Sequence, residues 1–133
     1  MMPDTMRQEL GDRFESYEIE AEASVGAGHI AVGYGYFRES DLGTVIFYAT
    51  CIDGVVEIEP IVVSEGYSDR PSYELVSARV ELDLPEPDRV QLVVEYSWVF
   101  YFDVIAMYDE QSLKYEGDGR ETLTFVKSDL SRQ

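Results

Sequence analysis

The chain has 133 residues and a formal net charge of −17, from 27 acidic and 10 basic residues. This length fits one domain, and the charge is about twice the upper end of the roughly 2–8 that a small soluble domain carries. A hydrophobic fraction of 45% with 13% aromatic residues excludes global disorder, because disordered chains combine high charge with few apolar residues. The negative charge also argues against direct binding to nucleic acid or to a membrane surface.

The cysteine content and the N-terminal residues predict a cytoplasmic protein. Cys51 is the only cysteine, so no intramolecular disulfide can form, whereas small secreted domains tend to be rich in disulfides. The first residues lack the basic and apolar regions of a signal peptide. No apolar run approaches the about 18 residues of a membrane-spanning helix.

Residues 3–14 form the one segment whose pattern predicts a helix. Its large apolar residues recur at every fourth position and would share one face: Met6, Leu10 and Phe14. Asp4 would cap the N-terminus, and Gly11 would weaken the helix. We therefore expect residues 1–15 to form a short helix or a loose arm.

From residue 16 onward, apolar residues alternate with a period of two, which is typical of half-buried strands. Asp53-Gly54 predicts a two-residue hairpin turn, because both residue types tolerate positive φ. Gly33 and Gly35 share one face of a strand and predict a bulge or a close backbone approach there. The strands predicted in this half of the chain are residues 16–25, 29–37, 44–52 and 55–63. Residues 26–28 form the turn between the first two strands, and residues 53–54 form the turn between the last two.

The second half of the chain predicts less regular strands. Residues 73–84 alternate, with Val76, Ala78, Val80, Leu82 and Leu84 pointing inward. Residues 89–108 exceed the usual strand length of about 3–10 residues, so we expect a bend or break near residues 97–101. A closing hairpin is expected from residues 111–115 and 121–127, joined across residues 116–119.

These segments predict an all-β fold, an antiparallel β-sandwich or barrel of about eight or nine strands with one short N-terminal helix or arm. We expect a single acidic domain over residues 1–133. All of the net negative charge lies in residues 1–110, whereas the closing hairpin and tail, residues 111–133, are neutral. A charge distributed so unevenly suits a directional contact with a partner.

Part of the acidity is spaced in rows along the predicted strands. At a rise of about 3.4 Å per residue, outward carboxylates two residues apart stand roughly 6.8 Å apart. Such rows imitate the phosphates of nucleic acid, which carries one charge per about 3.4 Å of axis on each strand. The alternative interpretation is that outward strand positions are simply polar. The candidate partner-binding residues are Glu18, Glu20, Glu22, Glu57, Glu59, Glu81 and Asp83.

No motif predicts catalysis, a metal site or a cofactor. His29 is the only histidine, which is too few for the usual zinc sites, and Cys51 lies among apolar residues like a buried structural thiol. The glycine pairs near residues 26–35 do not lead into a helix that could hold a phosphate. Residues 116–121 hold three acids beside two glycines, but their spacing differs from that of an EF-hand loop. We therefore expect no enzyme, no cofactor and no metal.

Three classes of function remain. The first is a non-enzymatic inhibitor that binds a basic protein surface by imitating nucleic acid, in the manner of phage or mobile-element counter-defence proteins such as anti-restriction and anti-CRISPR proteins. The second is a structural or interaction β-domain of a larger assembly or virion, in which tyrosines serve the contact surface. The third is a salt-adapted acidic protein of unrelated function. The patterned acidity favours the first class, while the partner and the oligomeric state stay open.

Overall fold

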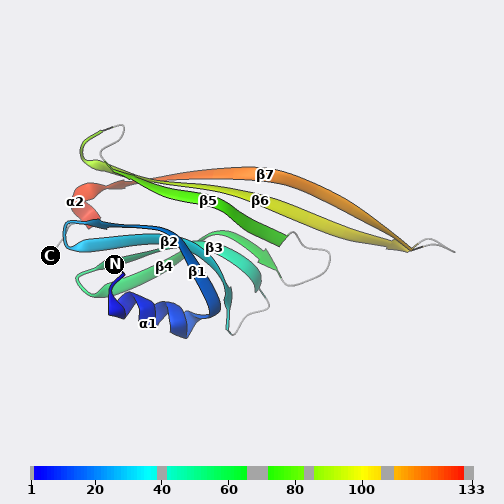
Figure 1. The fold of residues 1–133 in the computed structure, drawn as a ribbon, viewed down its shortest axis with the longest axis horizontal. Coiled ribbons are helices and arrows are strands. Elements are labelled where there is room, and N and C mark those ends of the chain that lie inside the picture. The colour runs from blue at the N-terminus through cyan, green and yellow to red at the C-terminus, as the bar shows by residue number, and fades with distance from the viewer. Residues whose placement is uncertain (1, 39–41, 66–71, 83–85, 106–109, 131–133) are drawn as a thin grey trace.

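The computed structural model describes residues 2–38, 42–65, 72–82, 86–105 and 110–130. These ranges form seven antiparallel strands in two sheets, ordered β1-β2-β3-β4 and β5-β6-β7, with a short helix at each end (Figure 1). The predicted antiparallel β-fold is confirmed, but the expected eight or nine strands are too many and the two sheets do not close into a barrel. The elements are α1 Asp4–Arg13, β1 Phe14–Val25, β2 Gly28–Phe37, β3 Leu42–Ile52, β4 Val55–Glu65, β5 Ser72–Leu82, β6 Arg89–Ile105, β7 Glu110–Val126 and α2 Lys127–Leu130.

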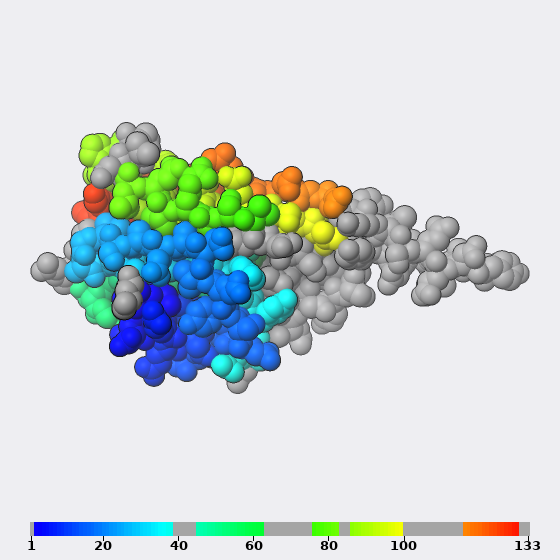
Figure 2. All heavy atoms as spheres, viewed as in Figure 1, coloured from blue at the N-terminus to red at the C-terminus, as the bar shows by residue number. Residues whose placement is uncertain are grey.

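The first sheet is covered on both faces. Helix α1 packs on one face, where its apolar residues join a core cluster with Phe47 and Ala49 of β3. The second sheet packs on the other face, where Val32 and Ile46 meet Leu92 and Val94. Strand β5 contacts all four strands of the first sheet, and Figure 2 shows its green atoms lying against the blue atoms of β1 and β2. Burial on both faces explains why β3 carries large apolar residues on both of its faces.

Helix α1 forms as its apolar spacing predicts. Met6 and Leu10 are fully buried and Phe14, which follows the helix, is 1% exposed. The expected cap is wrong: Pro3 occupies the N-cap position without a side-chain hydrogen bond, and Asp4 lies in the first turn. There the carboxylate is still favourable, because it faces the positive end of the helix dipole. No helix within the described ranges is long and apolar enough to cross a membrane.

Two hairpins of the first sheet, β1–β2 and β3–β4, have the turns that the sequence predicts. Asp53 and Gly54 have φ values of 53° and 76°, so both occupy the left-handed region that a type I′ turn requires. Gly26, in the turn between β1 and β2, has a φ of 59°. Tight turns of this kind set the pairing register of the strands on either side.

A β-bulge interrupts β1 at Glu20. Ile19 pairs with Gly33 and Ala21 pairs with Val32, so Glu20 is an extra residue without a partner of its own. The expected close backbone approach at Gly33 is confirmed, because a Cβ built there would lie 2.0 Å from the carbonyl oxygen of Glu18. The bulge reverses the faces to which the side chains of β1 point beyond residue 20.

Strands β6 and β7 form one long hairpin, which corrects two predictions. Each strand has 17 residues and pairs with the other over its whole length, so β6 has no break near residues 97–101. Residues 116–119 lie inside β7 rather than in a turn, because the rings of Trp98 and Tyr96 occupy the space beside Gly117 and Gly119. Aromatic rings that cover glycines in this way stabilise a strand that glycine would otherwise weaken. The hairpin extends beyond the first sheet as an arm (Figure 1).

Strand β5 is less regular than its alternation predicts. Ala78 and Val80 pack toward the first sheet as expected. Val76 is 60% exposed, because a bulge places it between the paired residues Leu75 and Ser77, and Leu82 is 38% exposed. The inward orientation predicted for Val76 is therefore wrong. Leu82 pairs with the buried Val90 and so lies on the inner face as predicted, although it is partly exposed at the end of the strand, and Leu84 lies outside the described residues.

Candidate functional site

The structure breaks the predicted row of carboxylates on β1. Residues directly paired across antiparallel strands share a face, and Glu18 pairs with Tyr34, which packs toward the second sheet. Glu22 pairs with Ala31, which belongs to the cluster on the α1 side. The bulge at Glu20 lies between them, so the expectation that all three share one face is wrong.

Three of the predicted carboxylates have close partners in the structure. The hydroxyl of Tyr34 donates a hydrogen bond of 2.7 Å to Glu18. Glu22 lies 3.6 Å from Nε2 of His29. On the outer face of the second sheet, Arg79 donates a hydrogen bond of 2.7 Å to Glu81. Asp83, the neighbour predicted to extend that row, lies outside the described residues.

The guanidinium of Arg79 is held between two carboxylates. Besides Glu81, it donates a hydrogen bond of 3.3 Å to Glu95 on the neighbouring strand. These hydrogen bonds, first that of Glu81, raise the pKa of Arg79 above its ordinary value. Glu81 is thus partly neutralised by the protein itself, which makes it a weaker contributor to a negative surface than an unpaired carboxylate.

Glu57 and Glu59 remain together on one face of β4. They pair across the sheet with Thr50 and Tyr48 of β3, and both glutamates are exposed. Tyr48 packs edge-on against Phe125 of β7 with ring centroids 5.4 Å apart, so this face points toward the second sheet. The pair therefore lies at the margin of the seam between the sheets, where β4 forms an edge of the first sheet.

Burial, followed by the negative charges of Glu59 and Glu57, raises the pKa of Tyr48 above 10.0. A raised pKa in the folded state stabilises the fold at pH values below the unfolded value of about 10, and this stabilisation is lost as the pH rises through the folded value. We expect the free energy of unfolding of the Tyr48→Phe variant to fall less steeply than that of the parent above pH 10. Urea unfolding in alkaline buffers measures this difference; equal slopes would contradict it.

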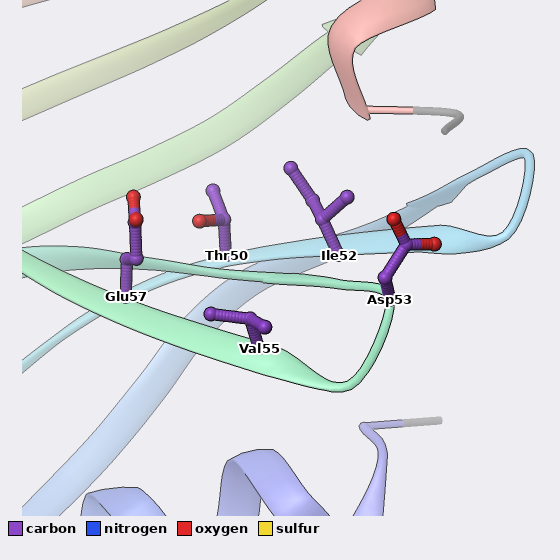
Figure 3. A pocket seen from close by; sticks show the side chains of 5 residues that line it. All are labelled: Thr50, Ile52, Asp53, Val55 and Glu57. Carbon is purple, nitrogen blue, oxygen red and sulfur yellow. The ribbon is translucent and has the colours of Figure 1, made fainter. Parts of the chain in front are cut away.

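A pocket of about 310 Å³ opens beside this acidic pair, at the turn between β3 and β4 (Figure 3). Two cross-strand pairs and the first turn residue line it: Thr50 with Glu57, Ile52 with Val55, and Asp53. Figure 3 shows Thr50, Ile52 and Glu57 projecting from the same side of the hairpin. The volume lies at the lower end of the about 300–1,000 Å³ of small-ligand sites. We call these five residues the hairpin pocket.

Two of the described arginines contact groups in other parts of the molecule. Arg89 lies 3.2 Å from Asp88, and Nε of Arg38 donates a hydrogen bond of 2.9 Å to the carbonyl oxygen of Gly11. None of the ion pairs formed within these ranges includes the carboxylates of Asp53, Glu57 or Glu59. This corner of the molecule therefore presents three carboxylates that no described cation neutralises.

The structure also brings together three polar residues that sequence reasoning did not connect. His29 is 4% exposed, and its Nδ1 lies 3.2 Å from the hydroxyl of Ser24, while Nε2 faces Glu22 without a hydrogen bond. This order of groups is reminiscent of a hydrolytic triad, but nucleophilic catalysis also needs a substrate pocket beside the hydroxyl. Neither the hairpin pocket nor the smaller pocket between Tyr17 and Tyr36 borders these residues.

Cys51 has the surroundings that the sequence predicts. It is 7% exposed and belongs to the core cluster beneath α1, which is the environment of an unreactive structural thiol. Within the described ranges, no three side chains of the metal-ligating types form a group that could hold a metal ion.

Sequence reasoning identified Glu57 and Glu59 but missed their neighbours Asp53, Thr50 and Tyr48. The signal was present, because a two-residue turn at Asp53-Gly54 fixes which residues of the flanking strands face one another. Searches with family models, among curated proteins and among solved structures found no match to this chain.

Proposed function

We propose that this chain is a non-enzymatic binding protein whose acidic corner docks on a positively charged protein surface. The observation that carries the proposal is the set of carboxylates on the β3–β4 hairpin, Asp53, Glu57 and Glu59, which form no ion pair with a cation of the described ranges. Like charges two residues apart on one strand face, such as those of Glu57 and Glu59, cost stability unless a partner or solvent ions screen them. A basic partner would remove that repulsion on binding.

The surroundings of these carboxylates suit a protein partner. Val55 is 60% exposed beside them, and the half-buried ring of Tyr48 adds aromatic surface. Protein interfaces combine aromatic and apolar centres with a polar rim, and the carboxylates would supply the rim here. Complementary charge also accelerates association by steering the partner toward the site.

Within this proposal, the favoured partner is a protein that handles nucleic acid. A groove that binds nucleic acid is lined with lysine and arginine, and an acidic surface competes for those side chains. Because the bulge divides the carboxylates of β1 between two faces, the imitation of phosphates rests on Glu57 and Glu59 of β4, with Glu18 on the same face of the first sheet.

Replacing Glu57 and Glu59 together with glutamine tests the proposal. We expect the double variant to bind its basic partner about two- to thirtyfold more weakly at low salt, because partly exposed ion pairs contribute about 0.2–1 kcal/mol each. The protein is immobilised, host lysate is applied at low salt, and the retained proteins are eluted with a salt gradient. The double variant should release its partner at lower salt than the parent.

A matched control removes the same charge elsewhere. Glu9→Gln with Asp12→Asn also raises the net charge by two, but both residues are exposed on α1, on the far side of the first sheet. This variant should elute like the parent. If both double variants elute alike, the position of the carboxylates is irrelevant and the proposal is wrong. Loss of folded structure by the parent at low salt would instead favour a salt-adapted protein.

The projecting β6–β7 hairpin favours a second candidate, an interaction domain of a larger assembly. Its paired backbone continues past Trp98 to Ile105, beyond the first sheet (Figure 1). A long paired arm of this kind is suited to contact a neighbouring subunit. Partner binding that survives molar salt and ignores the Glu57 and Glu59 substitutions would favour this candidate.

A further inference from the structure

We propose that the hairpin pocket holds the ammonium group of one lysine side chain of the basic partner. This inference rests on the proposed function and assigns the chemistry of its contact. Its three polar groups, the hydroxyl of Thr50 and the carboxylates of Asp53 and Glu57, are hydrogen-bond acceptors, and the apolar side chains of Ile52 and Val55 complete its lining.

Thr50 is the observation that points to a ligand. The residue is 7% exposed and lines the pocket, and its side-chain hydroxyl forms no hydrogen bond with another residue of the described ranges. Because this hydroxyl has no partner in the part of the chain that the structure describes and borders the pocket, its oxygen is available to accept a hydrogen bond from a ligand. Because Thr50 pairs directly with Glu57, their Cβ atoms lie about 4.5–5.5 Å apart, close enough for one cation to contact both side chains.

The apolar wall suits the stem of a lysine. Ile52 and Val55 form the second cross-strand pair of the pocket, and Val55 is 60% exposed although it is aliphatic. Lysine packs its methylene chain along apolar surface while its charged end reaches polar groups. The bound stem would cover Val55, and the ammonium group would lie among the three acceptors.

Other ligands fit the pocket less well. The two carboxylates repel anions, and no group in the described ranges offers three metal-ligating side chains. A guanidinium is planar and pairs best with one carboxylate in a two-pronged contact, whereas an ammonium donates three hydrogen bonds in separate directions. Acceptors supplied by two strands and a turn match the ammonium.

The site is preorganised by its turn. Asp53 is held with a φ of 53° in a type I′ geometry that fixes its position relative to both strands. Ile52 also packs against the cluster of Val25, Val90 and Leu130 at the seam with the second sheet. Little ordering is therefore needed when a side chain enters the pocket, which favours binding.

The test is a titration of the whole protein with the peptide acetyl-Gly-Lys-Gly-amide at low salt, followed through the methyl NMR signals of Thr50, Ile52 and Val55. We expect saturable shifts confined to these methyls. Acetylation of the lysine should abolish them, because the charge is lost. Absence of saturable shifts with the unmodified peptide would overturn the proposal.

Three variants distinguish binding in the pocket from attraction of the peptide by the overall negative charge of the protein. Glu57→Gln should weaken peptide binding about fivefold, and Thr50→Val, which keeps the side-chain shape, about three- to tenfold. Glu59→Gln is the matched control: it removes the same charge two residues away, outside the pocket, and should weaken binding less than about twofold. If Glu57→Gln and Glu59→Gln weaken peptide binding equally, the assignment of the lysine to the pocket is wrong.

Two further probes fix the ligand class. Tighter binding of acetyl-Gly-Arg-Gly-amide than of the lysine peptide would overturn the choice of lysine. Binding of spermidine more than about tenfold tighter than the peptide would overturn a protein side chain as the occupant. The proposed function is judged separately: it stands if the Glu57 and Glu59 double variant still elutes early while the peptide fails to bind.

Discussion

Replacing Phe47 with alanine is expected to lower the free energy of unfolding by about 3–5 kcal/mol, a large part of the 5–15 kcal/mol typical of a folded domain. Phe47 is fully buried, and its ring stacks on that of Phe14 with centroids 4.5 Å apart. Truncation removes this contact and leaves a cavity between α1 and the first sheet, which the flanking backbone cannot close. Urea unfolding at fixed ionic strength measures the loss.

Val76→Ala is the control for this prediction. It also removes methyl groups from a strand, but Val76 is 60% exposed at a bulge, so its free energy of unfolding should change by less than about 0.5 kcal/mol. A Phe47→Ala variant as stable as the control would show that the cluster beneath α1 contributes little to the fold.

Gly33→Ala is expected to destabilise the protein by about 3 kcal/mol, the upper end of the usual cost of overpacking. A Cβ at this position would lie 2.0 Å from the carbonyl oxygen of Glu18 and 3.1 Å from Cα of Ile19. Both are backbone atoms, so the bulge of β1 would have to move as a whole. The same urea unfolding experiment measures the effect.

Gly11→Ala provides the opposite case. Gly11 lies in α1, and a Cβ there would have nothing within 4 Å. Alanine should therefore stabilise the protein by about 0.5–1 kcal/mol, because glycine is the poorer helix former. If Gly33→Ala and Gly11→Ala shift the urea midpoint in the same direction, the close backbone contact at Gly33 does not explain why a glycine is needed there.

The local elements of the first sheet were predictable because each depends on neighbouring residues. The spacing of Met6, Leu10 and Phe14 specified the buried face of α1. Asp53-Gly54 specified a turn with positive φ, and that turn also implied the pairing of Thr50 with Glu57. The hairpin pocket could thus have been derived from the sequence by extending the register from the turn.

The β6–β7 hairpin was not predictable from local pattern. Gly117 and Gly119 resemble turn residues, and a turn among residues 116–119 was the natural expectation. They belong to a strand because Trp98 and Tyr96 cover them from the neighbouring strand, far away in the sequence. This contact between residues far apart in the sequence outweighs the low strand propensity of glycine.

The sequence by itself determined the antiparallel β-class, the N-terminal helix, the two tight turns of the first sheet and the excess of carboxylates, since these follow from composition, periodicity and turn chemistry. Only the tertiary structure decided where those carboxylates point. A single extra residue at Glu20 sends Glu18 and Glu22 to opposite faces, because side chains alternate with a period of two. Pairing of β3 with the edge strand β4 then places Glu57 and Glu59 on one exposed face, in the same hairpin as Asp53 and the hydroxyl of Thr50.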